Sequence, residues 1–208
     1  MKLKDLFVEI ASNYTVNHGL INELWNEIFL AYNDATRFYH NMDHLSIMFE
    51  ELKLVKAQIE NWDDVMFSTF YHDIIYSSLN NKNEALSAEY AKESLKLINV
   101  SPENISNCEK LILATKDHSK RSENDTNLFL DADMAILGYD WKAYSSYMEG
   151  VREEFSRYND ELYYKGRKDI LRKFLAGNIY HTSYFSKKYE LSAKENIKKE
   201  ILILYQRT

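Results

Sequence analysis

Residues that interrupt regular structure are scarce in this chain. It has one proline and five glycines among 208 residues, whereas folds built from many tight turns need these residues repeatedly. Even the proline suits a helix, because Ser101 before Pro102 is typical of an N-cap with proline in the first helical position. Apolar side chains recur four positions apart at Leu20, Leu24 and Ile28. The sequence therefore predicts an all-α fold, a bundle of about nine or ten helices.

Two glycines are interpreted as helix stops. Gly138 follows an apolar segment at 128–137, and Gly177 follows a helical pattern at 168–176. Polar composition predicts two loops, at 77–83 and 119–127.

The composition favours one domain over residues 1–208, with helices at 140–208 packed on a motif-bearing part at about 37–133. Lys and Arg number 26 against 32 Asp and Glu, so the net charge is −6, and the two signs are interspersed. This pattern argues against a nucleic-acid polymer or a membrane as partner. The single Cys108 cannot form an internal disulfide. Since no apolar run approaches the roughly 18 residues of a spanning helix, a cytoplasmic location is expected.

Histidines occur beside other candidate ligands at two places. His40 and His44 are four residues apart, which puts both imidazoles on one face if a helix includes them. Taken alone, such a pair is more often structural than metal-binding. His72 and Asp73 follow the apolar segment 66–71, so a histidine and a carboxylate are adjacent in a part of the chain that should be buried.

Two aspartates occur in a similarly apolar context. Asp131 and Asp133 lie between the apolar segments 128–130 and 134–137. An unpaired carboxylate in such surroundings is penalised by several kcal/mol. Either Asp131 caps the helix that runs to Leu137, or the acids share a cation with the histidines. Imidazole and carboxylate together suit Mn, Fe, Ni, Co or Zn, and the residue types leave the choice among these metals open.

The order of these parts, His, then His-Asp, then Asp in a helical chain, resembles the HD-domain superfamily of metal-dependent phosphohydrolases. Several blocks together are similar to the subfamily of predicted metal-dependent HD phosphohydrolases, and the likeness extends from about residue 37 to near the C-terminus. The blocks are Arg-Phe-Tyr-His-Asn at 37–41, Tyr-His-Asp at 71–73, Asn-Glu at 83–84, Phe-Leu-Asp-Ala-Asp at 129–133, Val-Arg-Glu-Glu-Phe at 151–155, Gly-Arg at 166–167 and Tyr-Glu at 189–190.

The resemblance implies a set of ligands for one divalent transition metal ion, or for two. These are His44, His72, Asp73 and Asp133. It also implies that His40 donates a proton to the leaving oxygen, since the block around it resembles that of cyclic-nucleotide phosphodiesterases. His118 would then hold a second metal ion or the phosphate of the substrate.

The chain departs from the family pattern after the His-Asp pair. Several nucleotide-cleaving members carry an acid there, whereas this chain has Ile74, Ile75 and Tyr76. Glu84 is the candidate to supply a base or a supporting contact instead. A capping role for Glu84 after Asn83 has equal weight.

The predicted function is hydrolysis of a phosphate ester, a nucleotide or a related small phosphorylated molecule, by a metal-activated water. Asp73 would orient the nucleophile, and His40 would protonate the departing oxygen. The candidates for binding the phosphate or the substrate are Arg37, Lys116, His118, Arg152 and Arg167. Arg152 and Arg167 lie among other charges, so a solvated surface or a structural ion pair is favoured for both.

Two alternatives belong to other functional classes. The missing acid after Asp73 allows a sensor module that binds a nucleotide or phosphate on a degenerate site without turnover. An iron oxygenase on the same fold would need more histidines than His118 between the His-Asp pair and the last aspartate, which disfavours it. Oligomeric state is not predicted.

Overall fold

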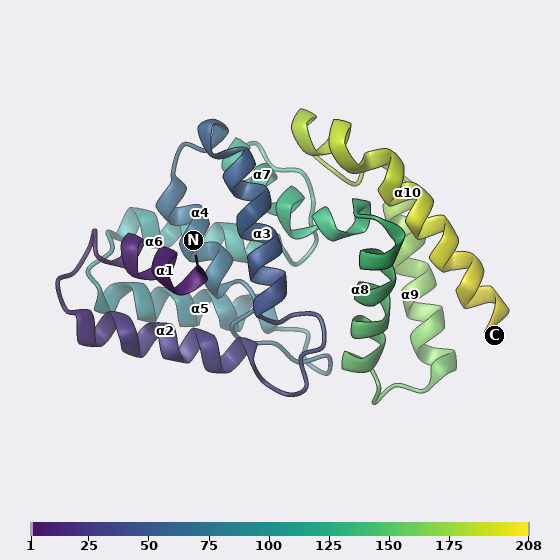
Figure 1. Cartoon of the computed structure of the whole chain (residues 1–208), viewed down its shortest axis with the longest axis horizontal. Coiled ribbons are helices and arrows are strands. Elements are labelled where there is room, and N and C mark those ends of the chain that lie inside the picture. Colours follow the sequence, from purple (N-terminus) through teal and green to yellow (C-terminus); the bar gives the residue numbers. More distant parts are fainter. Residues whose placement is uncertain (1, 208) are drawn as a thin grey trace.

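A computed structural model describes residues 2–207, and within this range the chain is helical without a strand, which confirms the all-α prediction (Figure 1). There are ten α-helices and two short 3-10 helices in that range. They are α1 (Leu3–Ala11), α2 (His18–Tyr32), α3 (Met42–Leu54), η1 (Lys56–Gln58), α4 (Trp62–Tyr71), α5 (Asn83–Leu97), α6 (Pro102–Ala114), α7 (Asn124–Asp133), η2 (Ala135–Gly138), α8 (Trp141–Glu154), α9 (Asp160–Leu175) and α10 (Ser183–Gln206).

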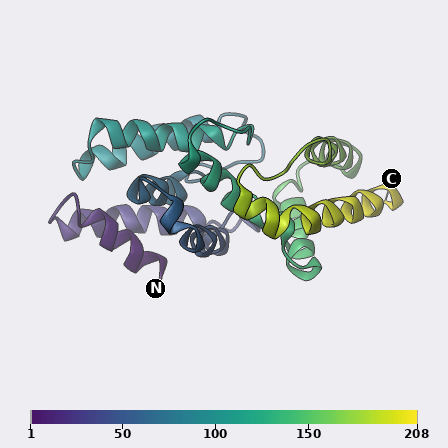
Figure 2. The same ribbon diagram turned by 90° about the horizontal axis from the view of Figure 1, so that it is seen from above.

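The helices form two groups. Helices α1–α7 pack together at one end of the molecule, and α8–α10 lie at the other end, as both views show (Figures 1 and 2). The short helix η2 joins the groups, and α10 packs along it while also contacting α7, α8 and α9. The second group is therefore anchored to the first through η2 and the beginning of α10. Whether the two groups act as one domain stays a prediction.

Aromatic side chains form much of the core of the first group. The ring centroids of Phe7 and Phe70 are 5.2 Å apart, and those of Trp25 and Phe70 are 6.2 Å apart. Leu24 and Ile28 of α2 are buried against this cluster, while Leu20 is partly buried. Burial of these apolar stripes holds the helices together.

Two predicted helix boundaries agree with the structure. Helix α6 begins at Pro102, and the Ser101 hydroxyl oxygen accepts a hydrogen bond from the Asn104 backbone N–H at 3.2 Å. This is the expected N-cap, since the side chain satisfies a free donor of the first turn. Helix α9 ends at Leu175, next to the predicted stop at Gly177.

The boundaries predicted between 119 and 138 were wrong in part. Helix α7 already begins at Asn124, within the predicted loop, and the apolar segment 128–137 does not form one helix. The α-helix ends at Asp133 and the chain tightens into η2 before Gly138. The reason for the glycine also differs from the predicted cap, because no glycine in residues 2–207 has positive φ. A Cβ at Gly138 would lie 2.4 Å from the Cβ of Tyr189, so the missing side chain allows α10 to pack closely on η2.

None of the helices in residues 2–207 is both long enough and apolar enough to cross a lipid bilayer.

Candidate metal centre

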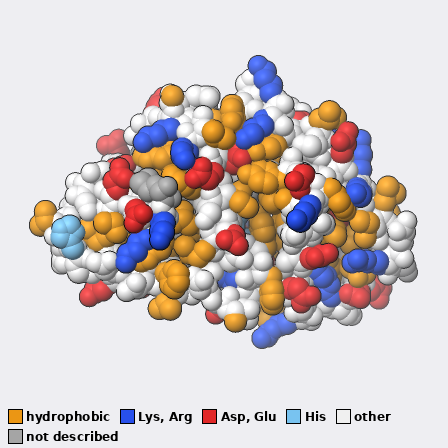
Figure 3. Space-filling model, viewed as in Figure 1, with side chains coloured by type: hydrophobic (Ala, Val, Ile, Leu, Met, Phe, Trp, Pro, Cys, Tyr) orange, Lys and Arg blue, Asp and Glu red, His pale blue; other side chains and the backbone are white. Residues whose placement is uncertain are grey.

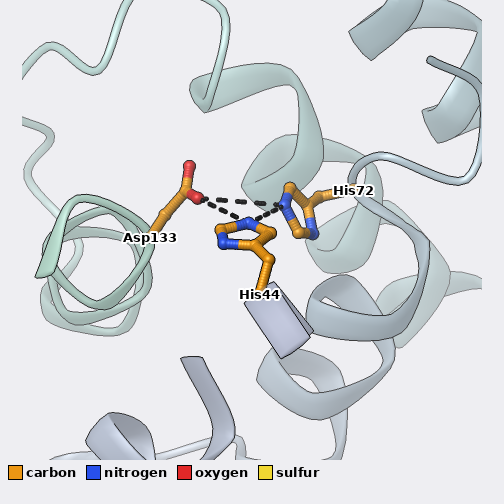
Figure 4. A group of neighbouring side chains, drawn as sticks. All are labelled: His44, His72 and Asp133. Carbon is orange, nitrogen blue, oxygen red and sulfur yellow. Dashed lines mark hydrogen bonds and ion pairs between the residues drawn. The ribbon is translucent and has the colours of Figure 1, made fainter. Parts of the chain in front are cut away.

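Three side chains from separate helices of the first group converge on one point (Figure 4). His44 lies in the first turn of α3, His72 is the residue that ends α4, and Asp133 is the last residue of α7. One ligand atom from each lies within 4.8 Å of the others. The two Nε2 atoms are 3.1 Å apart, and Asp133 Oδ1 lies 3.2 Å from His44 Nε2 and 3.8 Å from His72 Nε2. His44 and His72 are 28 positions apart in the sequence and His72 and Asp133 are 61 positions apart, yet the three side chains aim at one point.

The donor atoms fit a shared cation. A metal ion holds imidazole nitrogens at about 2.0–2.1 Å, which separates two of them by roughly 3.0–3.4 Å. His72 Nδ1 lies 3.0 Å from the backbone oxygen of Thr69, and if Nδ1 donates there, Nε2 presents its lone pair to the site. His44 Nδ1 is buried and has no hydrogen-bond partner among the described residues. These side chains could hold a metal ion, while the metal and the number of ions stay predictions.

The charges of these groups are strongly coupled. Burial opposes protonation of His72, but the nearby carboxylates of Asp73 and Asp133 outweigh it and raise its pKa to about 9. Burial prevails at His44 and lowers its pKa. At Asp133 burial opposes ionisation, but hydrogen bonds from His118 and His44 hold its pKa well below the ordinary value. The site thus favours positive charge where the donors meet, and a bound cation would take the place of a proton there.

Asp73 lies at the edge of this group. Its Oδ2 atom is 3.2 Å from His72 Nε2 and 4.0 Å from His40 Nε2. Burial disfavours the ionised carboxylate, but the charge and hydrogen bond of His72 outweigh burial and lower the pKa of Asp73. Its backbone N–H donates to the Tyr32 hydroxyl at 3.1 Å, which fixes the turn after α4. Asp73, a predicted metal ligand, therefore lies beside the three-residue group and also faces His40, the predicted proton donor.

His40 precedes α3 rather than sharing a helical face with His44, since that helix begins at Met42. The two rings are nevertheless close, with centroids 5.8 Å apart. The His40 ring also stacks on Tyr76 at 4.2 Å with an interplanar angle of 27°. His40 is thus oriented by its neighbours, and not by the helical spacing that the sequence suggested.

Glu154, at the end of α8, is a functional candidate that the sequence analysis did not single out. Its Oε2 atom lies 2.7 Å from His40 Nδ1 and accepts from the Tyr76 hydroxyl at 2.9 Å. Its Oε1 atom accepts the backbone N–H groups of Tyr39 and His40 at 2.8 and 2.9 Å. The only signal in the sequence was its place in the block at 151–155. Glu154 orients His40 so that Nε2 faces Asp73.

His40 and Glu154 also shift each other's pKa. Burial opposes the charged imidazole, but the hydrogen bond to Glu154 and the charge of Asp73 raise the pKa of His40. Burial opposes the charged carboxylate, but the His40 hydrogen bond lowers the pKa of Glu154. Both shifts favour the protonated imidazole of His40 beside the candidate metal ligands.

His118 reaches the site from the turn after α6. Its Nε2 atom lies 2.8 Å from Asp133 Oδ2, and its backbone has a positive φ of 49°. The His118 backbone oxygen is also 2.8 Å from His181 Nε2. Since positive φ is strained for a residue with a side chain, these contacts explain how the turn is held. His118 is placed where it can contact either Asp133 or a bound group.

Asp131 points to the opposite side of α7 from Asp133, because residues two positions apart on an α-helix are rotated by about 200° around its axis. Its carboxylate accepts the backbone N–H groups of His181 and Thr182 at 2.7 and 2.8 Å, and the Thr182 hydroxyl at 2.6 Å. The suggested capping of its own helix is wrong, because Asp131 lies within α7. It holds the segment that begins α10, and Asp133 faces the histidines.

Two of the side chains predicted to bind phosphate, Arg37 and Arg152, donate hydrogen bonds to backbone oxygens instead. Arg37 donates to the backbone oxygens of Asp73 and Ile74 at 2.6 and 2.9 Å, which ties the segment before α3 to the turn after α4. Arg152 donates to the backbone oxygens of Phe155 and Tyr158 and to the Asp160 carboxylate. These arginines support the walls of the site.

The three remaining candidates have different surroundings. Arg167 is buried in an ion pair with Glu200 at 2.7 Å, as favoured from its charged context. Lys116 is exposed, and its side chain does not line the cavity described below. Glu84 is the second residue of α5 and does line it. Neither the catalytic nor the capping interpretation of Glu84 has a hydrogen bond to support it in the described residues.

A cavity of about 530 Å³ opens beside the three-residue group. His40, His118 and Asp133 lie at one end, and side chains of α8 and α9 form the opposite wall. This volume is in the range of about 300–1,000 Å³ typical of small-molecule sites.

Comparison with models of protein families, with curated proteins and with solved structures yielded no match to this chain.

Proposed function

We propose that this protein is a metal-dependent hydrolase of phosphate esters and that it is related to the HD-domain phosphohydrolases. The observation that supports this most is the convergence of His44, His72 and Asp133 within 4.8 Å, from three helices. The resemblance of the motif blocks and the adjoining cavity support the same proposal. The substrate is a small phosphorylated molecule.

His44, His72 and Asp133 would hold the metal ion, with Asp73 and His118 beside it. When bound, such an ion lowers the pKa of coordinated water and draws electron density from a phosphoryl oxygen. In a chain of net charge −6, the ion would also offset the repulsion between the acidic site and an anionic substrate.

Proton transfer is the part of the reaction that the chain itself would perform. Glu154 holds His40 Nδ1 at 2.7 Å and thereby turns Nε2 towards Asp73. From this position Nε2 would give a proton to the oxygen of the departing alcohol. Asp73 would accept a hydrogen bond from the attacking water, and His118 would contact the phosphate.

The experiment that tests the proposal measures metal and turnover on the same samples. Purified protein should contain about one or two transition metal ions per chain, by analogy with known imidazole–carboxylate centres, and should hydrolyse phenyl phosphate with Mn²⁺, Ni²⁺ or Co²⁺. His72→Ala should lose both properties, and the exposed His18→Ala variant is the matched control. Folded protein that binds no metal contradicts the proposal, and tight phosphate binding without turnover favours the sensor alternative.

A further inference from the structure

The cavity beside the candidate metal centre has two unlike ends. His40, His118 and Asp133 form the polar end. The chain then continues from Asp133 into Met134, Ile136 and Leu137, which also line the cavity. Apolar surface therefore begins at the next residue after the candidate ligand.

Helix α9 completes the apolar wall with a stripe spaced by four residues. Leu162, Gly166 and Ile170 all line the cavity, as expected for positions on one helical face. Leu162 is 59% exposed and Ile170 is 47% exposed. In the face drawn in Figure 3, hydrophobic side chains also gather near the middle of the molecule, between the two groups of helices. Large apolar side chains are thus left accessible next to a polar centre.

The cavity wall has little charge available for a second anionic group. Among the described residues that line it, Arg167 is the only Lys or Arg. Its guanidinium donates to both Glu200 carboxylate oxygens, at 2.7 and 3.1 Å, and to the Tyr147 hydroxyl at 3.0 Å. Glu84 adds a negative charge to the wall. The wall also carries the neutral polar residues Ser77, Ser78, Asn80 and Asn83, which offer hydrogen bonds but no positive charge. A polyphosphate tail would therefore lack a cationic partner away from the centre and would be repelled by Glu84.

We propose that the cavity takes the organic part of a phosphomonoester whose alcohol is uncharged and largely apolar, either aromatic or aliphatic. The phosphate lies at the polar end and the apolar part lies against η2 and α9. The inference rests on the proposed function for the identity of the polar end. It excludes nucleoside triphosphates as preferred substrates, because their extra phosphates would have no cationic partner.

A series of non-hydrolysable phosphonates tests the apolar wall by binding alone. Methyl-, propyl- and hexylphosphonate are titrated into the Mn²⁺-loaded protein in a calorimeter. Affinity should rise about two- to fourfold per added methylene that enters the cavity, as expected for transfer of a methylene from water. Addition of a terminal negative charge, in 6-carboxyhexylphosphonate, should weaken binding at least about tenfold relative to hexylphosphonate.

Gly166 offers a variant that changes the wall and leaves the polar end intact. A Cβ built there meets no atom within 4 Å, so Gly166→Leu should fold and fill part of the cavity. It should weaken hexylphosphonate binding by about tenfold and leave methylphosphonate nearly unchanged. Gly177 also has no atom within 4 Å of its Cβ position and does not line the cavity. Gly177→Leu is therefore the matched control and should leave both affinities unchanged.

The outcomes separate this inference from the proposed function. Affinity that does not depend on chain length, or hexylphosphonate binding that survives Gly166→Leu, overturns the apolar wall even if phenyl phosphate is hydrolysed. Chain-length dependence that Gly166→Leu removes supports it even if no ester is hydrolysed, in which case the hydrolase proposal fails alone. Absence of binding by every phosphonate overturns the inference.

Discussion

The two groups of helices line one cavity with different chemistry. Helices α1–α7 supply His44, His72 and Asp133, which point at each other and carry perturbed pKa values, and of these three Asp133 lines the cavity itself. Helices α8 and α9 supply mainly apolar and aromatic wall together with the paired Arg167, and Glu154 of α8 reaches across to His40. The comparison suggests a division of labour, in which one group would hold the reacting centre and the other would shape the space for the organic group.

The largest expected effect separates Asp133 from Asp131, two of the aspartates of α7. Asp133→Asn should reduce metal affinity by more than the roughly 10–100-fold that follows loss of a supporting partner of a metal ligand. The reason is that Asp133 is the only carboxylate in the three-residue group. Metal content after dialysis and activity on phenyl phosphate provide the measurements.

Asp131→Asn is the internal control for that experiment. The variant should keep the metal but destabilise the fold by about 1–3 kcal/mol. The reason is that a neutral amide accepts hydrogen bonds from the N–H groups at the start of α10 more weakly than the carboxylate does. Equal metal loss in both variants would contradict the assignment of Asp133 to the centre.

Glu154→Gln tests the contact by which the second group orients His40. The amide keeps the shape but not the charge that favours protonated His40, so turnover of esters with poor leaving groups should fall about 10–100-fold. Esters with good leaving groups, such as 4-nitrophenyl phosphate, need less proton donation and should be affected less. Metal content should stay at the wild-type level. A uniform loss across both classes of ester would show that Glu154 acts only on structure.

Gly138→Ala tests the junction between the groups and has a smaller expected effect. Its new methyl group would lie 2.4 Å from the Cβ of Tyr189, and relief of such overpacking typically costs about 1–3 kcal/mol. Urea unfolding followed by circular dichroism should show the loss. Gly177→Ala, in open space, should change the free energy of unfolding by less. Equal stability of the two variants would mean that α10 can move away from η2 freely.

The same division explains what the sequence could predict. Helical periodicity and the lack of glycine and proline identified the fold class, because each is a local property. His72 and Asp133 stood out because polar groups in apolar segments need a partner, and His44 because it lies four residues after His40. The family resemblance then grouped the three as ligands. Glu154 did not stand out, since it lies in a charged segment where most carboxylates face water. Its partners His40 and Tyr76 are 114 and 78 positions away, and only the tertiary structure brings them together.

Boundaries and special backbone were harder to predict for a physical reason. Gly138 had the signature of a helix cap, but its role is a close contact with Tyr189, which is distant in sequence. Arg37 was a candidate for phosphate because a cation near a histidine motif suggests one, and its hydrogen bonds to the Asp73 and Ile74 backbone oxygens depend on the turn after α4. Such roles arise from packing and leave no periodic trace.

Because Asp131 and Asp133 point in opposite directions, one turn of α7 makes contacts on two sides. Any shift of that backbone that draws Asp133 towards the histidines also carries along Asp131, which grips His181 and Thr182. This turn of α7 therefore couples the position of the candidate metal centre to that of the segment that leads into α10. A change at either end of this turn would disturb the other end, whereas the cavity-facing side of α9 makes none of these hydrogen bonds.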